Sequence, residues 1–191
     1  MVDPKAYIVM DLEFNSPNAS SFVTKNGISL KSEIVEIGAV KLDKDLNTVD
    51  TFRKYIRPDA YFKMRDEIVK ITEITTEMIW EGEPFKDAIG EFLDWCGEDF
   101  VFITWSENDI LAIEDNMLYH GLDIEGLPEC YDIQLMFDDQ VTMYDKRMPL
   151  NYAIWKFDFK PEPQHDALSD AINTAEVFRR LDLEELEEYA V

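Results

Sequence analysis

Two acidic residues end the first apolar segment of the chain. Asp11 and Glu13 follow the run Tyr7–Met10. In a strand, residues two apart point to the same face, so both carboxylates project together. Like charges held side by side are unfavourable unless a cation neutralises them or one of them binds a proton. Oxygen ligands of this kind suit Mg²⁺ or Mn²⁺, and the pair predicts a metal site. The alternative is a solvent-exposed strand end.

A third carboxylate, Asp109, follows the apolar run Phe100–Thr104 and opens a predicted helix. The partial positive charge at a helix N-terminus favours an acid there whatever else that acid does. Asp109 is therefore either a further metal ligand or an ordinary residue of a first helical turn.

The segment from His165 to Asp170 is the most specific signal. His165 comes just after Pro161 and Pro163, and Asp170 lies in an apolar helical pattern. A five-residue step rotates a helix by about 140°, so the two side chains converge only if His165 lies in the loop before the helix. Asp170 falls near the buried face, where a carboxylate needs a partner or a metal. The alternative is a capping histidine and an exposed aspartate.

The order of the predicted elements places these residues in one mixed α/β domain spanning residues 1–191, with a core of about residues 6–181. An antiparallel meander of three strands comes first, with a polar loop, Asn15–Ser32, after its first strand: Ala6–Glu13, Glu33–Leu42 and Thr48–Arg57. Helices and a short buried strand then alternate: Pro84–Cys96, Phe100–Thr104, Asp109–His120 and Asp166–Leu181. The acidic tail, Asp182–Val191, is predicted to form a short surface helix.

The charge of the chain restricts its partners. Among 191 residues, 41 acids outweigh 18 bases, giving a net charge of −23, with 46% hydrophobic residues. This composition is globular, and it argues against nonspecific coating of DNA or of an anionic membrane. Residues 81–191 carry 28 acids and 7 bases, whereas residues 1–80 carry 13 and 11. An anionic partner should approach residues 53–70, where bases cluster: Arg53, Lys54, Arg57, Lys63, Arg65 and Lys70.

The remaining reactive residues indicate no further chemistry. Cys96 and Cys130 lack metal-ligand spacing and lie in apolar contexts, so we expect them to be reduced and buried. His120 ends a helix before Gly121, where a cation favours the helix dipole, and we assign it no catalytic role. No segment resembles a secretion signal or a transmembrane span, so the expected location is the cytoplasm.

Taken together, the carboxylates and His165 resemble the DEDDh 3′→5′ exonuclease family of the RNase H-like fold, over about residues 6–181. That family includes polymerase proofreading subunits, RNase T and oligoribonuclease; the details here are most similar to the sporulation-inhibitor-type and histone-mRNA-type exonucleases. The spacing His165-x4-Asp170 is that of the His subclass. Four other segments match family motifs in order: Asp11–Glu13, Glu33–Val40 (EIVEIGAV), Ile71–Thr75 (ITEIT) and Trp105–Asp109 (WSEND). Glu73 and Ser106 depart from the pattern, because glycine is commoner at both positions.

The resemblance implies a two-metal hydrolase that uses Mg²⁺ or Mn²⁺. By resemblance, Asp11 bridges both ions, Glu13 and Asp170 hold the ion that carries the attacking water, and Asp109 supports the second ion. His165 would be the general base, since an unperturbed histidine pKa near 6.5 suits proton abstraction at neutral pH. The product would be a nucleoside 5′-monophosphate. Four residues are candidate substrate contacts: Leu12, Phe14, Thr72 and Trp105. Ordinary core packing is the alternative for Leu12, Phe14 and Trp105.

The implied partner is the 3′ end of single-stranded RNA or DNA, bound by a monomer or homodimer, with no membrane. Two rival interpretations stay open. One is a catalytically idle module of the same fold that binds nucleic acid or protein; such modules typically lose a metal-binding carboxylate, whereas this chain keeps four. The other is an acidic protein whose residues 87–145 bind a basic partner or Ca²⁺, although the D-x-[DN]-x-[DN]-G calcium pattern is absent.

Overall fold

The first strand, β1 (Ala6–Asn15), organises the fold because its side chains alternate between two covered faces. The computed structural model describes residues 4–17, 22–142 and 146–191. Ile8, Met10 and Leu12 pack into one buried cluster, whereas Tyr7 and Val9 belong to another on the opposite face. Asp11 and Glu13 continue the second alternation, so they point to the same face as Tyr7 and Val9.

The described residues form one six-stranded sheet and a separate hairpin. The sheet order is β6-β5-β4-β1-β7-β8. The strand β1 pairs antiparallel with β4, and β4 pairs antiparallel with β5, which confirms the predicted meander. The strands β7 and β8 continue the sheet in parallel with β1, so the sheet is mixed as predicted. The remaining strand bounds are β2 (Val23–Lys25), β3 (Ile28–Leu30), β4 (Glu33–Asp43), β5 (Thr48–Arg57), β6 (Glu83–Pro84), β7 (Phe100–Thr104) and β8 (Cys130–Asp132).

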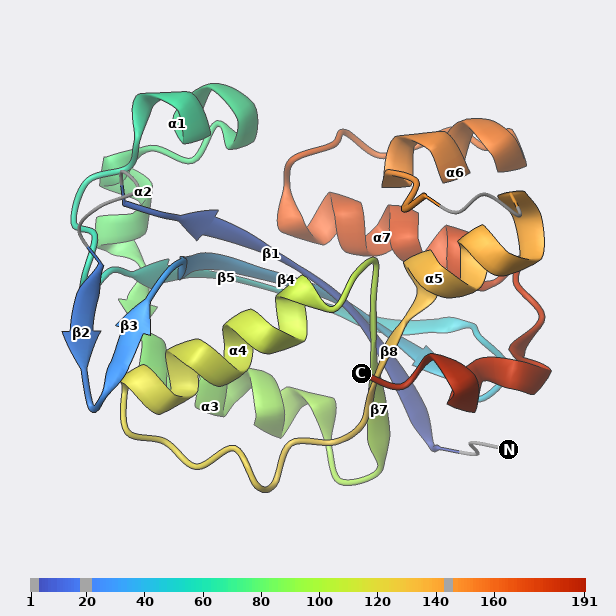
Figure 1. Cartoon of the computed structure of the whole chain (residues 1–191), viewed down its shortest axis with the longest axis horizontal. Coiled ribbons are helices and arrows are strands. Elements are labelled where there is room, and N and C mark those ends of the chain that lie inside the picture. Colours follow the sequence, from blue (N-terminus) through green and yellow to red (C-terminus); the bar gives the residue numbers. More distant parts are fainter. Residues whose placement is uncertain (1–3, 18–21, 143–145) are drawn as a thin grey trace.

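Helices cover both faces of the sheet (Figure 1). The cluster that contains Ile8 packs against α3 (Phe85–Cys96) and α4 (Asn108–Tyr119), and the cluster that contains Val9 packs against α7 (Ala167–Phe178). The other helices are α1 (Asp66–Thr72), α2 (Thr76–Glu81), α5 (Ile133–Phe137) and α6 (Leu150–Phe157). In Figure 1, α1 and the chain that leads into α7 both lie above β1.

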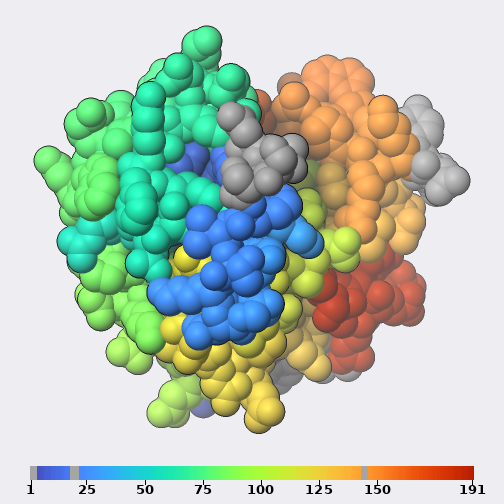
Figure 2. All heavy atoms as spheres, turned by 60° about the vertical axis from the view of Figure 1, so that its left-hand side comes forward, coloured from blue at the N-terminus to red at the C-terminus, as the bar shows by residue number. Residues whose placement is uncertain are grey.

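Several short elements differ from the sequence predictions. The predicted loop Asn15–Ser32 contains the β2–β3 hairpin, which covers the front of Figure 2 in blue. Neither β8 nor α5 was predicted, because three to five residues are too few to show a periodicity. The tail forms a 3₁₀ helix, Leu183–Tyr189, whose Leu186 is buried in the core, so it is part of the fold as well as of the surface.

The two cysteines and His120 lie as the sequence predicted. Cys96 and Cys130 are free thiols and both are buried. The helix α4 ends at His120, its C-cap, and Gly121 follows with a φ of 72°. Within the described residues, none of the helices combines the length and apolar character needed to cross a membrane.

A glycine sets the distance between α7 and the sheet. A Cβ placed on Gly38 of β4 would lie 2.1 Å from the backbone carbon of Ala167 and 2.1 Å from the backbone nitrogen of Leu168. Gly38 is the register partner of Asp11. The first turn of α7 therefore rests directly on the sheet beside Asp11, at a distance that only glycine permits.

We predict that Gly38→Ala lowers the free energy of unfolding by about 3 kcal/mol, since the methyl group would collide with backbone that cannot rotate away. Gly90→Ala is the matched control. Gly90 is an exposed position inside α3, and a Cβ added there would meet no atom within 4 Å, so alanine should stabilise the helix by about 0.5–1 kcal/mol. Urea denaturation followed by circular dichroism measures both. Equal stability of the two variants would contradict the close packing.

Candidate active site

Three carboxylates meet where α7 crosses the end of β1. Asp11, Glu13 and Asp170 each offer an oxygen, and these atoms lie within 4.8 Å of one another. The alternation of β1 supplies the first two, and the first turn of α7 supplies the third. The pairing of β1 with β4 shifts register directly after Glu13, and such irregularities occur often beside active sites. The sequence predicted that these three residues would converge, and the structure brings them together.

Burial and, after it, the repulsion between neighbouring carboxylates raise the pKa values of the cluster. Burial raises the pKa of Asp11 well above its usual range, and the charges of Asp109, Asp170 and Glu13 raise it further. Burial and the neighbouring charge of Glu36 raise the pKa of Glu13 to about 8. Carboxylates in this state either hold protons or need cations. The hard oxygen donors fit Mg²⁺ or Mn²⁺, whose charge would remove the repulsion.

Asp109 lies beside this group but outside the three mutually close oxygens. It is buried in the first turn of α4. The strand β7 covers β1 only as far as Val9, which pairs with Ile103. Beyond that point the backbone N–H of Leu12 donates a hydrogen bond to Asp109, which lowers its pKa. Burial outweighs this effect and raises the pKa of Asp109 to about 7. The position suits a ligand of a second cation next to Asp11.

His165 lies in the loop before α7, as the prolines predicted. Its backbone has a φ of 67°, in the left-handed region, and its backbone N–H donates to Oδ2 of Asp170 at 2.8 Å. That bond lowers the pKa of Asp170, although burial raises it by more. The side chain of His165 is exposed. The loop thus ties a candidate general base to a candidate metal ligand.

A groove of about 500 Å³ opens beside His165, between its loop and the α1–α2 segment. Thr72, a predicted substrate contact, lines this groove together with Ile71 and Glu73. Glu73 has a φ of 60° and ends α1. Glycine adopts a positive φ without strain, and this explains why glycine is commoner at this position of the ITEIT motif. The glutamate therefore places a carboxylate on the groove wall.

The other three predicted substrate contacts differ in their surroundings. Leu12 and Trp105 are buried in the core, and the Trp105 ring packs on Phe137 with centroids 5.6 Å apart. Core packing, the alternative stated for both, describes their environment. Phe14 is partly buried and lines a hollow of about 390 Å³ together with Leu111 of α4, so its ring remains accessible to a ligand.

The basic run of residues 53–70 is partly committed to ion pairs. Lys54 pairs with Glu83 at 2.9 Å and with Glu91 at 2.5 Å, and Arg65 lies 3.5 Å from Glu67. In the described part of the chain, three of the exposed bases of the run make no ion pair: Arg57, Lys63 and Lys70. These three remain available to an anionic partner.

Sequence reasoning assigned no role beside the carboxylates to Glu36 or Arg53. Glu36 is fully buried opposite Glu13, and Arg53 Nε donates to its Oε1 at 2.6 Å. Burial raises the pKa of Glu36, and Arg53 opposes that shift. The signal was visible in the sequence as one acid inside the otherwise apolar strand segment Ile34–Val40. The sequence did not identify Arg53 as the partner of Glu36, because neither segment alone determines the register in which β4 and β5 pair.

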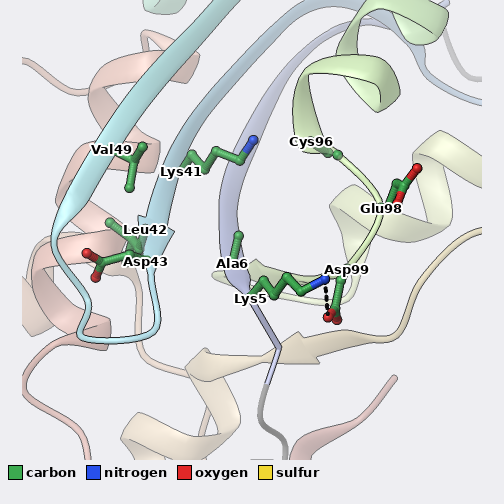
Figure 3. A pocket seen from close by; sticks show the side chains of 10 residues that line it. Lys5, Ala6, Lys41, Leu42, Asp43, Val49, Cys96, Glu98 and Asp99 are labelled. Carbon is green, nitrogen blue, oxygen red and sulfur yellow. Dashed lines mark ion pairs between the residues drawn. The ribbon is translucent and has the colours of Figure 1, made fainter.

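The hollow drawn in Figure 3, of about 400 Å³, lies at the opposite end of β1. Its lining includes Ala6 at the start of β1 and an ion pair between Lys5 and Asp99 at 3.6 Å. None of the predicted site residues lines it. The candidate chemistry is therefore confined to the end of β1 where Asp11 and Glu13 lie.

Comparisons with known proteins agree with this geometry. A family model described as Exonuclease (RNase_T) matches residues 8–178. A probable 3′-5′ exonuclease, KapD of Bacillus subtilis (strain 168), is 25% identical over 178 residues, covering 90% of this chain and 82% of KapD. The DNA polymerase III subunit epsilon of Aquifex aeolicus (strain VF5) is 29% identical over 181 residues, covering 94% of this chain and 81% of the subunit.

Solved structures share the fold. The nuclease domain of 3′hExo, described as a DEDDh family member bound to rAMP, superposes with a TM-score of 0.78 at 18% identity, over 97% of this chain and 93% of that domain. The Mg²⁺- and Mn²⁺-bound form of S. pombe Pop2p gives a TM-score of 0.65 at 19% identity, over 94% of this chain and 82% of Pop2p. The RNase H-like exonuclease fold expected from the motifs is confirmed.

We predict that the metal-free protein loses stability as the pH rises. The pKa of Glu13 is about 8 in the folded state against 4.5 for a free side chain. Between these pH values the folded state binds more protons than the unfolded state does. The stability that this proton contributes is therefore lost as the pH rises through about 8. The melting temperature in EDTA should fall between pH 6 and pH 8.5 by at least about 2–4 °C, the shift that about 1 kcal/mol produces in a domain of this size.

Glu13→Gln should weaken this dependence, because the variant has no proton to lose at position 13, while Asp11 and Asp109 still titrate with raised pKa values. Mn²⁺ should flatten it in the wild type, because the cation replaces the protons. A metal-free melting temperature that stays constant or rises across this interval would contradict the assigned repulsion. Differential scanning fluorimetry over a pH series measures all three samples.

Proposed function

Because the chain belongs to the exonuclease (RNase_T) family, we propose that it is a metal-dependent 3′→5′ exonuclease. It hydrolyses phosphodiester bonds at the 3′ end of single-stranded nucleic acid and releases nucleoside 5′-monophosphates. The observation that carries this proposal is the convergence of Asp11, Glu13 and Asp170 directly beside the loop of His165. The name of KapD supports the reaction class.

The cofactors are two divalent cations, Mg²⁺ or Mn²⁺. Asp11, Glu13 and Asp170 would hold one of them, and Asp109, next to Asp11, would help to hold the other. When bound, such ions activate a water, polarise the phosphate and neutralise the departing 3′ oxygen. The ions bound to the Pop2p neighbour support this assignment.

The chain's own groups complete the reaction. His165 accepts a proton from the attacking water, and its exposed side chain leaves it able to approach a phosphate bound at the carboxylates. The backbone bond from His165 to Asp170 keeps the base and a metal ligand on one short segment. Thr72 and Phe14 lie at hollows near the site and are proposed to contact the last nucleotides.

The charge distribution fits attack on a chain end better than binding along a duplex. Phosphates are repelled by most of the surface of a protein of net charge −23. Bound cations reverse the sign of the potential at the carboxylates, and the unpaired bases Arg57, Lys63 and Lys70 lie on the side of α1 and β5. The strand is therefore held mainly at its 3′ terminus and only when the cations are present.

We predict that Asp11→Asn abolishes release of 5′-nucleotides and that His165→Ala lowers the rate by about 10²–10⁴-fold, the usual contribution of a general base. His120→Gln is the matched control, since the other histidine stacks on Phe85 far along α4 and should retain wild-type activity. Digestion of 3′-labelled and 5′-labelled oligonucleotides with Mg²⁺ or Mn²⁺, analysed for product identity, measures the effect. Full activity of His165→Ala would show that the assigned base is wrong.

The same assay discriminates the rival functions. Matched RNA and DNA strands, single and double, identify the preferred substrate. A folded wild-type protein that cleaves none of them with either metal would favour a catalytically idle binding module, because the carboxylates would then serve no hydrolysis.

We further predict that nucleic-acid binding depends on metal. The slow variant His165→Ala should bind a fluorescent single strand with Mn²⁺ and lose most of that binding in EDTA, because uncompensated carboxylates repel the terminal phosphates. Fluorescence anisotropy at fixed ionic strength measures the difference. Tight binding in EDTA would contradict the proposed end-directed mode.

A further inference from the structure

Two neighbouring rows of residues cross three strands beneath the start of α7. On the face that carries the carboxylates, the register aligns Asp11 of β1 with Gly38 of β4 and Gly38 with Arg53 of β5. The neighbouring row aligns Glu13 with Glu36, and Glu36 with Tyr55. Opposite residues in a sheet point to the same face. Glu36 and Arg53 therefore lie on the same face of the sheet as Asp11 and Glu13.

Arg53 contacts both sides of the site. Its Nε donates to Oε1 of Glu36 at 2.6 Å, and its Nη2 forms an ion pair with Asp166. The same nitrogen donates to the hydroxyl of Tyr55 at 2.7 Å. Glu36 uses its other oxygen to accept the backbone N–H of Ala167 at 3.4 Å. Arg53, Glu36 and the start of α7 thus form a closed ring of contacts.

The segment held by this ring carries two proposed functional groups. Asp166 follows His165 directly and caps α7 through the backbone N–H of Ser169 at 2.9 Å. Asp170 lies one turn later. The positive φ of His165 is a conformation that persists only where surrounding contacts fix it, and Arg53 supplies one such contact from the sheet.

Glu36 gives Arg53 a second task. This carboxylate is fully buried directly opposite Glu13, so without a partner it would add a further negative charge beside the proposed metal ligands. Arg53 and the Ala167 backbone occupy one oxygen each. Glu36 is thereby kept as a support of α7 and is not free to act as an additional ligand.

We propose that Arg53 is a positioning residue for the hydrolysis. By binding Glu36 and Asp166 together, it holds the segment of His165 and Asp170 against the sheet and neutralises the extra carboxylate beside the metal site. This inference rests on the proposed nuclease function, and it makes a separate statement about metal binding that does not depend on turnover.

The test compares Arg53→Gln with the wild type in three measurements: kcat and KM on a 3′-labelled single strand, Mn²⁺ affinity by calorimetry, and melting temperature. We expect kcat to fall by about 10–100-fold, the effect of a small misplacement of catalytic groups, with KM within about twofold. Mn²⁺ affinity should rise by about three- to tenfold, because removing a cation leaves the charge of Glu36 to attract the metal. Loss of the fold would lower both kcat and the Mn²⁺ affinity.

Three further variants separate the two tasks. Glu36→Gln combined with Arg53→Gln should return the Mn²⁺ affinity to the wild-type value while kcat stays low, since Asp166 remains unpaired. Asp166→Asn keeps a helix-capping side chain and should lower kcat without raising the Mn²⁺ affinity. Lys54→Gln is the matched control: Lys54 neighbours Arg53 on the opposite face of β5 and also makes two ion pairs, and its loss should leave kcat and Mn²⁺ affinity unchanged.

The results that would overturn the proposal are distinct from a failure of the proposed function. Wild-type kcat in Arg53→Gln, an unchanged or weaker Mn²⁺ affinity, or the same losses in Lys54→Gln would each overturn it. If the wild type cleaves no nucleic acid, the nuclease function fails, and calorimetry alone then decides on Arg53: tighter Mn²⁺ binding that returns to normal in the double variant supports it, and unchanged binding overturns it.

Discussion

The mutual repulsion of buried carboxylates is the constraint on which the rest of the structure depends. One carboxylate oxygen each of Asp11, Glu13 and Asp170 lies within 4.8 Å of the others. Burial raises the pKa values of Asp11 and Glu13, and the charges of Asp109 and Glu36 raise them further. Such a cluster is unfavourable in isolation, so the surrounding fold must be stable enough to impose it. The cluster therefore carries an unfavourable electrostatic energy that bound divalent cations would remove. By the proposed function, a phosphate would be attracted to this point only when the cations are bound.

The fold imposes the cluster through a few close contacts. Gly38 allows the first turn of α7 to lie on β4, which brings Asp170 to β1. The strand β1 extends past the end of β7, and the N–H of Leu12 that this exposes is bound by Asp109. Arg53 closes the opposite side by joining β5 to the start of α7. Each contact links a proposed metal ligand or its neighbour to a different element, so the ligands come from distant parts of the sequence.

The sequence was sufficient for features that depend on local pattern. Alternation before Pro58 defined β5 and a short apolar run defined β7, both to the residue, and the two-residue spacing of Asp11 and Glu13 placed them on one face. Prolines located His165 in a loop. Features that depend on register or on very short elements were missed: β8 has three residues, and the Glu36–Arg53 pair exists only because β4 and β5 align. Trp105 lies in the core because α5 packs over it through Phe137, which the motif around it does not reveal.

The central claim is that these carboxylates hold two catalytic cations. Anomalous diffraction from crystals soaked with Mn²⁺ and a nucleoside 5′-monophosphate measures this directly. The account predicts two manganese peaks about 3.5–4 Å apart, with Asp11 bound to both, Glu13 and Asp170 on one side and Asp109 on the other. Manganese found only away from Asp11, or a fully occupied nucleotide beside a cluster without manganese, would contradict it.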